Sequence, residues 1–376
     1  MDEEKGAAGP DETVPLGERL RERVRAAGAI SFRDWMEAAL YDPRGGYYSR
    51  ADLTRWGRAG DYRTAPERSP LFAATFADYF ARVYEELGSP DQWTIFEAGA
   101  GAGHFAQGVL RTLRDDHPRV FAATRYVIDE RSEDARSRAR SVLDDLAARV
   151  QFQQLSDISS PAGTGIVIAN ELLDALPVHR VTLRGGVLRE LYVAWDDREG
   201  KFAWAEGEPG TPRLAEYFAR SGVVLSEGQT AEVNLEAEAW LKVAARAFEG
   251  GRLVLVDYGA EAEDLFAAPH RRGGTLRAFH RHRFADDVLA RPGEQDLTTT
   301  IDWTRVRKVS EELGLEVVSF ERQDGFLLRA GLLGRLERMS SEAATEADAV
   351  VLRSTARELI LPGGMSDSFQ VLVQKK

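Results

Sequence analysis

The fold of this chain is decided by the stretch Ile95-Phe96-Glu97-Ala98-Gly99-Ala100-Gly101-Ala102-Gly103-His104-Phe105-Ala106. Apolar residues followed by alternating glycines predict a buried strand over 94–98, a tight turn, and a helix over 104–115. Glycine permits positive φ and lets a ligand approach backbone N–H groups that a Cβ would shield. The stretch therefore predicts a turn that binds a nucleoside-containing cofactor.

The spacing of these glycines bears on the choice of cofactor. A dinucleotide site typically reads G-x-G-x-x-G, and counting from Gly99 places His104 where the third glycine belongs. Counting from Gly101 ends on Ala106, which the looser form of the pattern permits, so NAD or FAD stays open. Glu97 favours S-adenosyl-L-methionine (SAM), because a carboxylate repels a pyrophosphate but attracts an amino group and a sulfonium.

Bulk composition excludes several classes of protein. The 376 residues suffice for one large α/β domain with insertions or for two smaller domains. The net charge of −12 argues against a nucleic-acid partner and permits a basic protein segment as substrate. The chain has no cysteine, which excludes disulfides and thiolate chemistry. With no apolar run of 18 residues and no signal peptide, we expect a cytoplasmic protein without membrane insertion.

Strand and helix patterns alternate along most of the chain. This alternation predicts an α/β fold, with a mostly parallel sheet and helices on both faces. After the opening unit we expect strands over 125–129, 150–155, 165–169, 252–257, 315–320 and 369–374, and helices over 132–147, 171–175, 234–248 and 303–313. Before it we expect helices over 16–24, 32–40 and 71–87.

We expect the chain to divide into three parts. Residues 1–13 should form a disordered tail, 14–90 a helical segment with a long polar loop, and 91–376 the main domain. Insertions interrupt the main domain at about 180–230 and 260–300. The first of these begins with two hairpin turn signals, which are typical of an antiparallel meander that covers a pocket.

Polar residues that follow the predicted strands are the candidate site, because ligands bind at the carboxyl ends of strands in such sheets. Glu130 follows the second strand and can accept hydrogen bonds from both ribose hydroxyls. Asp157 follows the third and could bind an adenine amino group. Asn170, Glu171 and Asp174 follow the fourth, and both carboxylates should lie on the first turn of a helix and face one cleft.

A purely structural role for these acids stays open as well. Carboxylates are favoured at the start of a helix whatever their function, so those after the second and fourth strands could be helix caps or solvated groups. Asp257 and Tyr258 add a carboxylate and a phenol to the same rim. We expect no metal at His280 and His282, because no third ligand lies near them in the sequence.

Taken together, the motifs resemble the MidA-like family of SAM-dependent methyltransferases, relatives of the mitochondrial complex I assembly factor that methylates a protein arginine. The resemblance covers residues ~28–374. It implies a Rossmann-like, seven-stranded class I methyltransferase sheet, mostly parallel with an antiparallel end strand. It rests on the segments 60–67, 97–103, 130–132, 169–178, 257–259, 274–277, 292–298 and 323–328. The chain departs from the family pattern at Tyr62, Arg63, Ala65 and Ala98, which bears on the substrate more than on the cofactor.

The resemblance also implies roles for particular residues. It implies that the catalytic residues are Glu171, Asp174 and Asn170, and that Glu67 or Asp257 assists them. The carboxylate pair would bind an arginine guanidinium in a bidentate manner and steer one of its nitrogens. The implied SAM-binding residues are Thr64, Pro66, Glu97, Gly99, Gly101, Gly103, Glu130, Asp157 and Asn170.

The resemblance implies a protein arginine N-methyltransferase whose substrate is a protein, such as a subunit of a respiratory complex. Three alternatives remain. With the same fold, the protein could methylate an oxygen or nitrogen atom of a small molecule, or it could be a non-catalytic SAM-binding assembly factor. A dinucleotide oxidoreductase is the least favoured. The sequence does not determine the acceptor or the oligomeric state.

Overall fold

The structure of this chain is a computed structural model that describes residues 14–50, 52–53, 69–267, 269–281, 283–361 and 368–376. The predicted tail over 1–13 lies outside the described residues. So do Thr64, Pro66 and Glu67, for which the resemblance implied a role, and His282.

Within the described residues, the main path of the central sheet has seven strands, in the spatial order β15-β16-β10-β5-β2-β3-β4. The last strand of the chain, β16, runs antiparallel to both of its neighbours, and the remaining pairs are parallel. This confirms the predicted Rossmann-like sheet. The strands are β2 (Trp93–Ala98), β3 (Thr124–Asp129), β4 (Val150–Phe152), β5 (Thr164–Asn170), β10 (Gly250–Ala260), β15 (Glu316–Arg322) and β16 (Phe369–Lys375).

Helices cover both faces of this sheet. Successive side chains of a strand point to opposite faces, so both faces of the sheet carry apolar side chains that must be buried. Ile95 belongs to the apolar core on one face, and Phe96 belongs to the core on the other. The first face is covered by α4 (Pro70–Glu86), α5 (His104–Asp116), α12 (Gln323–Ala330), α13 (Leu332–Ser341) and α14 (Glu346–Ile360). The second is covered by α9 (Leu235–Arg246) and α11 (Trp303–Glu312).

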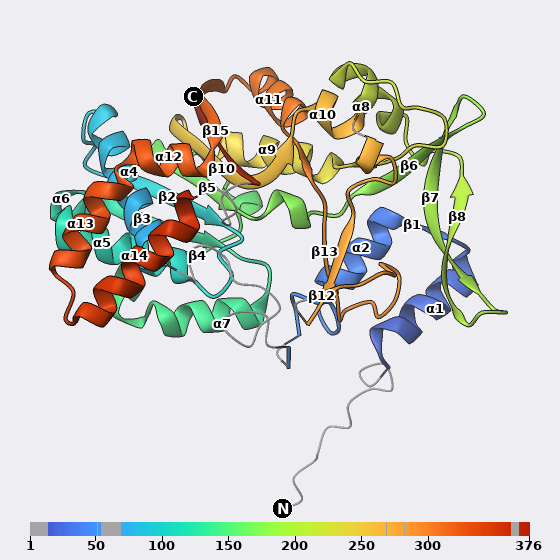
Figure 1. Cartoon of the computed structure of the whole chain (residues 1–376), viewed down its shortest axis with the longest axis horizontal. Helices are drawn as coiled ribbons and strands as arrows, with labels where there is room; N and C mark the ends of the chain where they lie inside the picture. The colour runs from blue at the N-terminus through green and yellow to red at the C-terminus, as the bar shows by residue number, and fades with distance from the viewer. Residues whose placement is uncertain (1–13, 51, 54–68, 268, 282, 362–367) are drawn as a thin grey trace, which may run out of the picture.

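The first insertion is an antiparallel meander, as predicted. It consists of β6 (His179–Arg184), β7 (Val187–Asp196) and β8 (Lys201–Gly207), joined by β1 (Ile30–Ser31) and β9 (Thr230–Val233). Helices α1 (Leu16–Ala27) and α2 (Phe32–Tyr41) pack on it through an apolar cluster that includes Trp35 and Phe202. Figure 1 places α1, β7 and β8 at the end of the molecule opposite α13 and α14.

The second insertion holds only short elements. These are α10 (Ala262–Ala267), the 3₁₀ turn η4 (Pro269–Arg271), β11 (Arg277–His280), β12 (Arg283–Phe284), β13 (Asp296–Thr298) and β14 (Ile301–Asp302). Strands β11 to β13 form a small sheet of their own, and β14 pairs with the end of β10. The three-part division of the chain stays a prediction.

Two predicted helices differ from the structure. The helix expected over 132–147 is α7 (Glu133–Val142), followed by the 3₁₀ helix η1 (Asp144–Arg149). The helix expected over 171–175 is only a 3₁₀ turn, η3 (Leu173–Ala175). Sequence patterns also missed α6 (Pro118–Ala123), α8 (Arg213–Ser221), β1 and β9.

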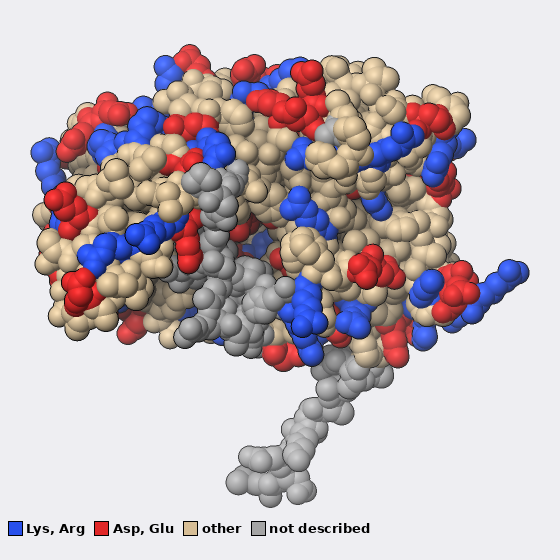
Figure 2. Space-filling model, in the orientation of Figure 1, with Lys and Arg blue, Asp and Glu red and all other residues tan. Residues whose placement is uncertain are grey.

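The surface is mixed in charge. Acidic and basic side chains are interspersed over the face shown in Figure 2.

Among the described residues, no helix combines the length and the apolar character needed to cross a bilayer.

Candidate active site

The turn between β2 and α5 lies at the carboxyl end of the central strand. Gly99, Gly101 and Gly103 have φ values of +71°, +53° and +82°, a region that side chains with a Cβ rarely adopt. The N–H of Gly99 donates to the carbonyl oxygen of Asp129 at 2.8 Å, which joins the turn to the end of β3. A Cβ on Gly103 would lie 2.9 Å from the Cβ of Ala139 in α7. Backbone conformation and packing thus both require glycine here.

Replacing Gly103 by Ala will lower the free energy of unfolding by about 2–4 kcal/mol, because left-handed strain adds to a steric clash. Gly185 is the matched control, since its φ is +58° but a Cβ there meets no atom within 4 Å. Gly185→Ala should therefore cost only about 1 kcal/mol. Urea denaturation measures both changes, and equal losses would contradict the packing argument.

Glu130 joins the end of β3 to the glycine turn. One of its carboxylate oxygens accepts the N–H of Gly101 at 2.9 Å, and the other accepts the N–H of Ser132 at 2.8 Å. Burial raises the pKa of Glu130, although these two N–H donors oppose the shift. The backbone bonds hold the carboxylate beside the turn with lone pairs left for further donors. Binding of ribose hydroxyls by Glu130 stays a prediction.

Glu97 lies near the end of β2, as predicted, and is buried there. Its side chain is only 4% exposed, and the hydroxyl of Tyr126 donates to its carboxylate at 2.7 Å. Burial raises the pKa of Glu97 to about 8, with a smaller contribution from the charge of Glu130. A positively charged ligand beside Glu97 would favour its ionised form, so attraction between this carboxylate and the sulfonium of SAM stays a prediction.

The raised pKa of Glu97 makes the stability of the protein depend on pH. A folded-state pKa of about 8 exceeds the ordinary 4.5, so the contribution of Glu97 is complete below pH 4.5 and is lost as pH rises through 8. We expect Glu97→Gln to flatten the fall in unfolding free energy over this range, by up to about 1.4 kcal/mol per pH unit. Denaturation at pH 5 to 8 tests this, with the exposed Glu133→Gln as control. An identical pH slope in wild type and Glu97→Gln would contradict it.

A cluster of acids lies at the carboxyl ends of β5 and β10. Asp257 accepts the N–H groups of Leu173 and Asp174 at 3.0 and 3.2 Å, which ties the segment after β5 to β10. The hydroxyl of Tyr258 donates to Asp174 Oδ2 at 2.5 Å. Beside them, Asn170 donates its side-chain amide to Glu171 at 3.2 Å. The fourth and fifth strands thus bring all these polar groups to one rim, as their positions predicted.

Burial raises the pKa of both aspartates at this rim. Burial raises the pKa of Asp174 to about 6, and the Tyr258 hydroxyl and the charge of Arg277 oppose the rise. Burial and the neighbouring charge of Asp174 raise the pKa of Asp257 well above its usual value. Because the negative charge of each carboxylate disfavours ionisation of the other, the two groups are coupled in their titration.

The predicted arrangement of Glu171 and Asp174 on one helical turn is wrong. Glu171 has a φ of +53°, and its N–H donates to the carbonyl of Val256 at 2.8 Å, so it bends the chain rather than starting a helix. Asp174 is 5% exposed and lies on the 3₁₀ turn. Asp157 is exposed, and the hydroxyl of Ser156 donates to it at 3.2 Å.

Sequence patterns did not indicate three contacts at or beside the site, although Arg277 belongs to a segment on which the family resemblance rests. Tyr126 lies on the same face of the sheet as Glu97, and only the pairing of β2 with β3 reveals this. Tyr41 donates its hydroxyl to the carbonyl of Ala175 at 3.0 Å, across 134 positions of sequence. Arg277 lies 5.7 Å from the ring centroid of Tyr258. Each contact is long-range, so no local signal could have found it.

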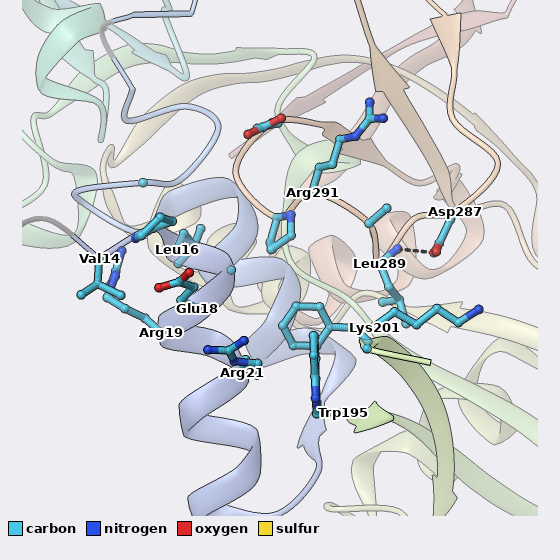
Figure 3. A pocket seen from close by; sticks show the side chains of 18 of the residues that line it. Val14, Leu16, Glu18, Arg19, Arg21, Trp195, Lys201, Asp287, Leu289 and Arg291 are labelled. Atoms are coloured by element: carbon cyan, nitrogen blue, oxygen red, sulfur yellow. Dashed lines mark hydrogen bonds between the residues drawn. The ribbon is translucent and has the colours of Figure 1, made fainter. Parts of the chain in front are cut away.

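A separate pocket of about 680 Å³ lies at the other end of the molecule. Helix α1, the ends of β7 and β8, and the loop that contains Asp287, Leu289 and Arg291 surround it (Figure 3). None of the strand-end residues described above lines this pocket. Within the described residues, no group of three His, Asp or Glu side chains is arranged to hold a metal ion.

Comparison with known proteins identifies the family. Residues 75–321 match the family model described as "Putative S-adenosyl-L-methionine-dependent methyltransferase". The chain belongs to this methyltransferase family. It is 29% identical, with a TM-score of 0.84, to a protein from Burkholderia thailandensis crystallised with bound S-adenosyl-homocysteine (SAH), and the match covers 98% of this chain and 95% of that one. The cofactor of this methyltransferase is therefore SAM, as predicted.

Two curated relatives cover nearly the whole chain. The protein arginine methyltransferase NDUFAF7 homolog, mitochondrial, of Drosophila melanogaster is 28% identical over 95% of this chain and 84% of its own length. The protein arginine methyltransferase NDUFAF7, mitochondrial, of Danio rerio is 26% identical over 93% and 84%. These matches support the MidA-like resemblance.

The same relatives correct one prediction. Both are named mitochondrial, which contradicts the cytoplasmic location expected from the sequence. The expectation rested on the lack of an 18-residue apolar run and of a signal peptide pattern. These features govern solubility and membrane insertion, and they do not specify a compartment.

The glycine turn of this methyltransferase fits its cofactor on structural grounds. Left-handed glycines leave the backbone open to a nucleoside, and Glu130 is held beside the turn by two backbone bonds. Burial raises the pKa of Asp129 at the end of β3, and the charge of Asp157 raises it further. The turn thus offers hydrogen-bond acceptors of the kind that ribose hydroxyls require, and their contact with a ribose stays a prediction.

Proposed function

We propose that this methyltransferase transfers a methyl group to an arginine side chain of a protein, and that Glu171 and Asp174 bind the acceptor. One observation carries the proposal. Asp174 Oδ1 is buried and has no hydrogen-bond partner among the residues that the structure describes. A buried carboxylate oxygen without a donor costs free energy, so it favours a ligand that donates. A guanidinium has five N–H donors in a planar fork, which suits carboxylates.

The surrounding groups support this use of Asp174. Tyr258 occupies Oδ2, which leaves Oδ1 for the substrate. The buried Asp257 accepts the backbone N–H groups of Leu173 and Asp174, so the acceptor carboxylate is held in place before the substrate arrives. Arginine is among the most favourable partners for such a site because it remains charged at all physiological pH values.

The residues at this rim must also accept a proton from the substrate. Bound SAM supplies an electrophilic methyl group on its sulfonium. The acceptor guanidinium must lose one proton around transfer, and a carboxylate with a pKa of about 6 takes it better than an ordinary aspartate does. Glu171, next to Asn170, lies close enough to Asp257 for its charge to raise the pKa of that residue. We therefore assign Asp174 as the base and Glu171 as the second guanidinium-binding group.

The relatives support a protein as substrate, because those from Drosophila melanogaster and Danio rerio are named protein arginine methyltransferases. A respiratory-complex subunit as the partner stays a prediction. The contacts of Thr64, Pro66, Asp157 and Asn170 with the cofactor are likewise proposals.

Incubation with methyl-labelled SAM and arginine-containing protein segments tests the proposal. We expect tandem mass spectrometry to find 14 Da added to arginine side chains. Glu171→Gln should reduce the rate about tenfold or more, because it removes one charge-assisted bond and leaves the side-chain shape unchanged. Label found only on small molecules would favour the metabolite alternative, and SAM binding without transfer would favour the assembly factor.

A further inference from the structure

The turn that carries Asp174 is short and buried. Leu173, Asp174 and Ala175 make up the 3₁₀ turn η3, and all three are buried. A backbone hydrogen bond from the N–H of Leu176 to the carbonyl of Leu173, at 3.3 Å, closes the turn. One turn of 3₁₀ helix has little stability of its own, because its hydrogen-bond geometry is poor. The position of Asp174 therefore depends on the contacts that hold the turn from outside.

The three carbonyl groups of η3 accept hydrogen bonds from three different parts of the chain. The side-chain amide of Asn234 donates to the first carbonyl at 2.9 Å. The backbone N–H of Thr299 donates to the second at 2.9 Å, and the hydroxyl of Tyr41 donates to the third at 3.0 Å. These donors are 61, 125 and 134 positions away from their acceptors in the sequence. The turn is thus held only in the folded protein.

The donors come from elements outside the central sheet. Tyr41 is the last residue of α2, Asn234 caps α9, and Thr299 lies between β13 and β14 of the second insertion. From the sheet itself, Asp257 of β10 accepts two N–H groups of the turn. The sheet therefore binds the N–H groups of η3, and the surrounding segments bind its carbonyl groups.

Tyr41 also contacts the loop that follows β3. The guanidinium of Arg131 lies 4.4 Å from the ring centroid of Tyr41, and Arg131 pairs with Glu37 of α2 at 2.7 Å. Arg131 directly follows Glu130, which binds the glycine turn. Burial raises the pKa of Tyr41, the charge of Arg131 opposes this rise, and the charges of Asp174 and Glu130 add to it. Tyr41 thus remains a hydrogen-bond donor and joins the loop after β3 to the turn after β5.

Asn234 uses both ends of its amide group. Its oxygen accepts the N–H of Ala237 at 2.8 Å and so caps α9, while its nitrogen donates to the carbonyl of Leu173. Reversing the amide would break both hydrogen bonds, because the oxygen has no proton to donate. Aspartate and serine cap helices as well as asparagine does. The cap alone therefore explains the oxygen of Asn234, and the contact with η3 explains the nitrogen.

We propose that Tyr41 and Asn234 are positioning residues for methyl transfer, and that they hold η3 so that Asp174 Oδ1 meets the acceptor guanidinium. The inference rests on the proposed function. A buried carbonyl that loses its donor costs free energy, so each bond restrains the turn. Misplacing a reacting group by about 1 Å lowers a rate by about 100-fold. Loss of either donor should therefore slow transfer and leave the cofactor site intact.

Two variants remove one donor each and keep the other contacts of the residue. Tyr41→Phe keeps the ring against Arg131, and Asn234→Asp keeps an oxygen that caps α9. We expect each to lower kcat for an arginine peptide about tenfold, with SAH affinity within about twofold by calorimetry. Tyr192→Phe is the matched control, because the Tyr192 hydroxyl donates to another backbone carbonyl, that of Glu208, at 2.8 Å. This variant should keep the kcat of the wild type.

Hydrogen exchange measures the restraint on η3 without catalysis. The N–H groups of Leu173, Asp174 and Leu176 should exchange about fivefold or more faster in Tyr41→Phe and Asn234→Asp than in the wild type, because a less restrained turn opens more often. All variants are compared below their melting temperatures. If Asn234→Asp folds poorly, Asn234→Ser replaces it, since serine also caps a helix and lacks the amide donor.

Unchanged kcat in both variants, with an active wild type, would overturn the inference, and so would unchanged hydrogen exchange. A loss of SAH affinity as large as the loss of rate would also overturn it, because the two residues would then act on the cofactor. Failure of the proposed function gives a different result, since the wild type itself would then methylate no arginine peptide. In that case faster exchange in the variants would still support the restraint on η3, and unchanged exchange would reject it.

Discussion

Replacing Asp174 by Asn will lower the rate of methyl transfer to an arginine peptide about 100-fold and leave SAH affinity within about twofold. Asparagine keeps the shape of the side chain and can still accept the Tyr258 hydroxyl. It removes the charge that binds the guanidinium and the group that takes its proton. The measurement is the steady-state rate with methyl-labelled SAM, together with calorimetric titration of SAH.

Asp302 provides the matched control. It is a buried aspartate that accepts a tyrosine hydroxyl, that of Tyr217, at 3.1 Å, and it caps α11. Burial raises its pKa as it does that of Asp174. Asp302→Asn should therefore show how much the rate falls when a buried aspartate outside the acid cluster is neutralised. Equal losses of rate in the two variants would remove Asp174 from the acceptor site.

Replacing Glu130 by Gln will weaken SAH binding about 100-fold. The amide group must face one of the two N–H donors that the carboxylate now accepts, those of Gly101 and Ser132, so one of them loses its partner. The variant also loses charged acceptor capacity beside the turn. Calorimetry measures the change in the dissociation constant.

Glu133 is the control for this variant, because it is exposed and pairs with Arg136 and Arg140 on the surface of α7. Glu133→Gln should leave SAH affinity unchanged, since exposed ion pairs contribute little. If Glu130→Gln binds SAH as tightly as the wild type does, Glu130 does not contact the cofactor and only supports the turn.

The sequence predicted the features that local physics determines. Gly99 and Gly103 follow an apolar strand, and the structure shows that both require left-handed backbone. The alternation of strands and helices was sufficient to predict the parallel sheet. The position of Asn170 at the end of β5, with Asp174 and Asp257 near the same edge of the sheet, followed from the same pattern, because parallel strands end at one edge.

The features that the sequence did not reveal depend on distant contacts. Glu171 leaves the helical region because its N–H pairs with Val256 and because Asp257 holds the segment after it. The raised pKa of Glu97 depends on its burial, which the hydrogen bond from Tyr126 opposes.

A crystal structure of the protein with SAH and an arginine peptide tests the central claim most directly. The account predicts that the guanidinium donates to Asp174 Oδ1 and to Glu171 at about 3 Å, with the ribose of SAH beside Glu130. A guanidinium bound elsewhere, with Asp174 Oδ1 covered by side chains of the protein itself, would contradict it.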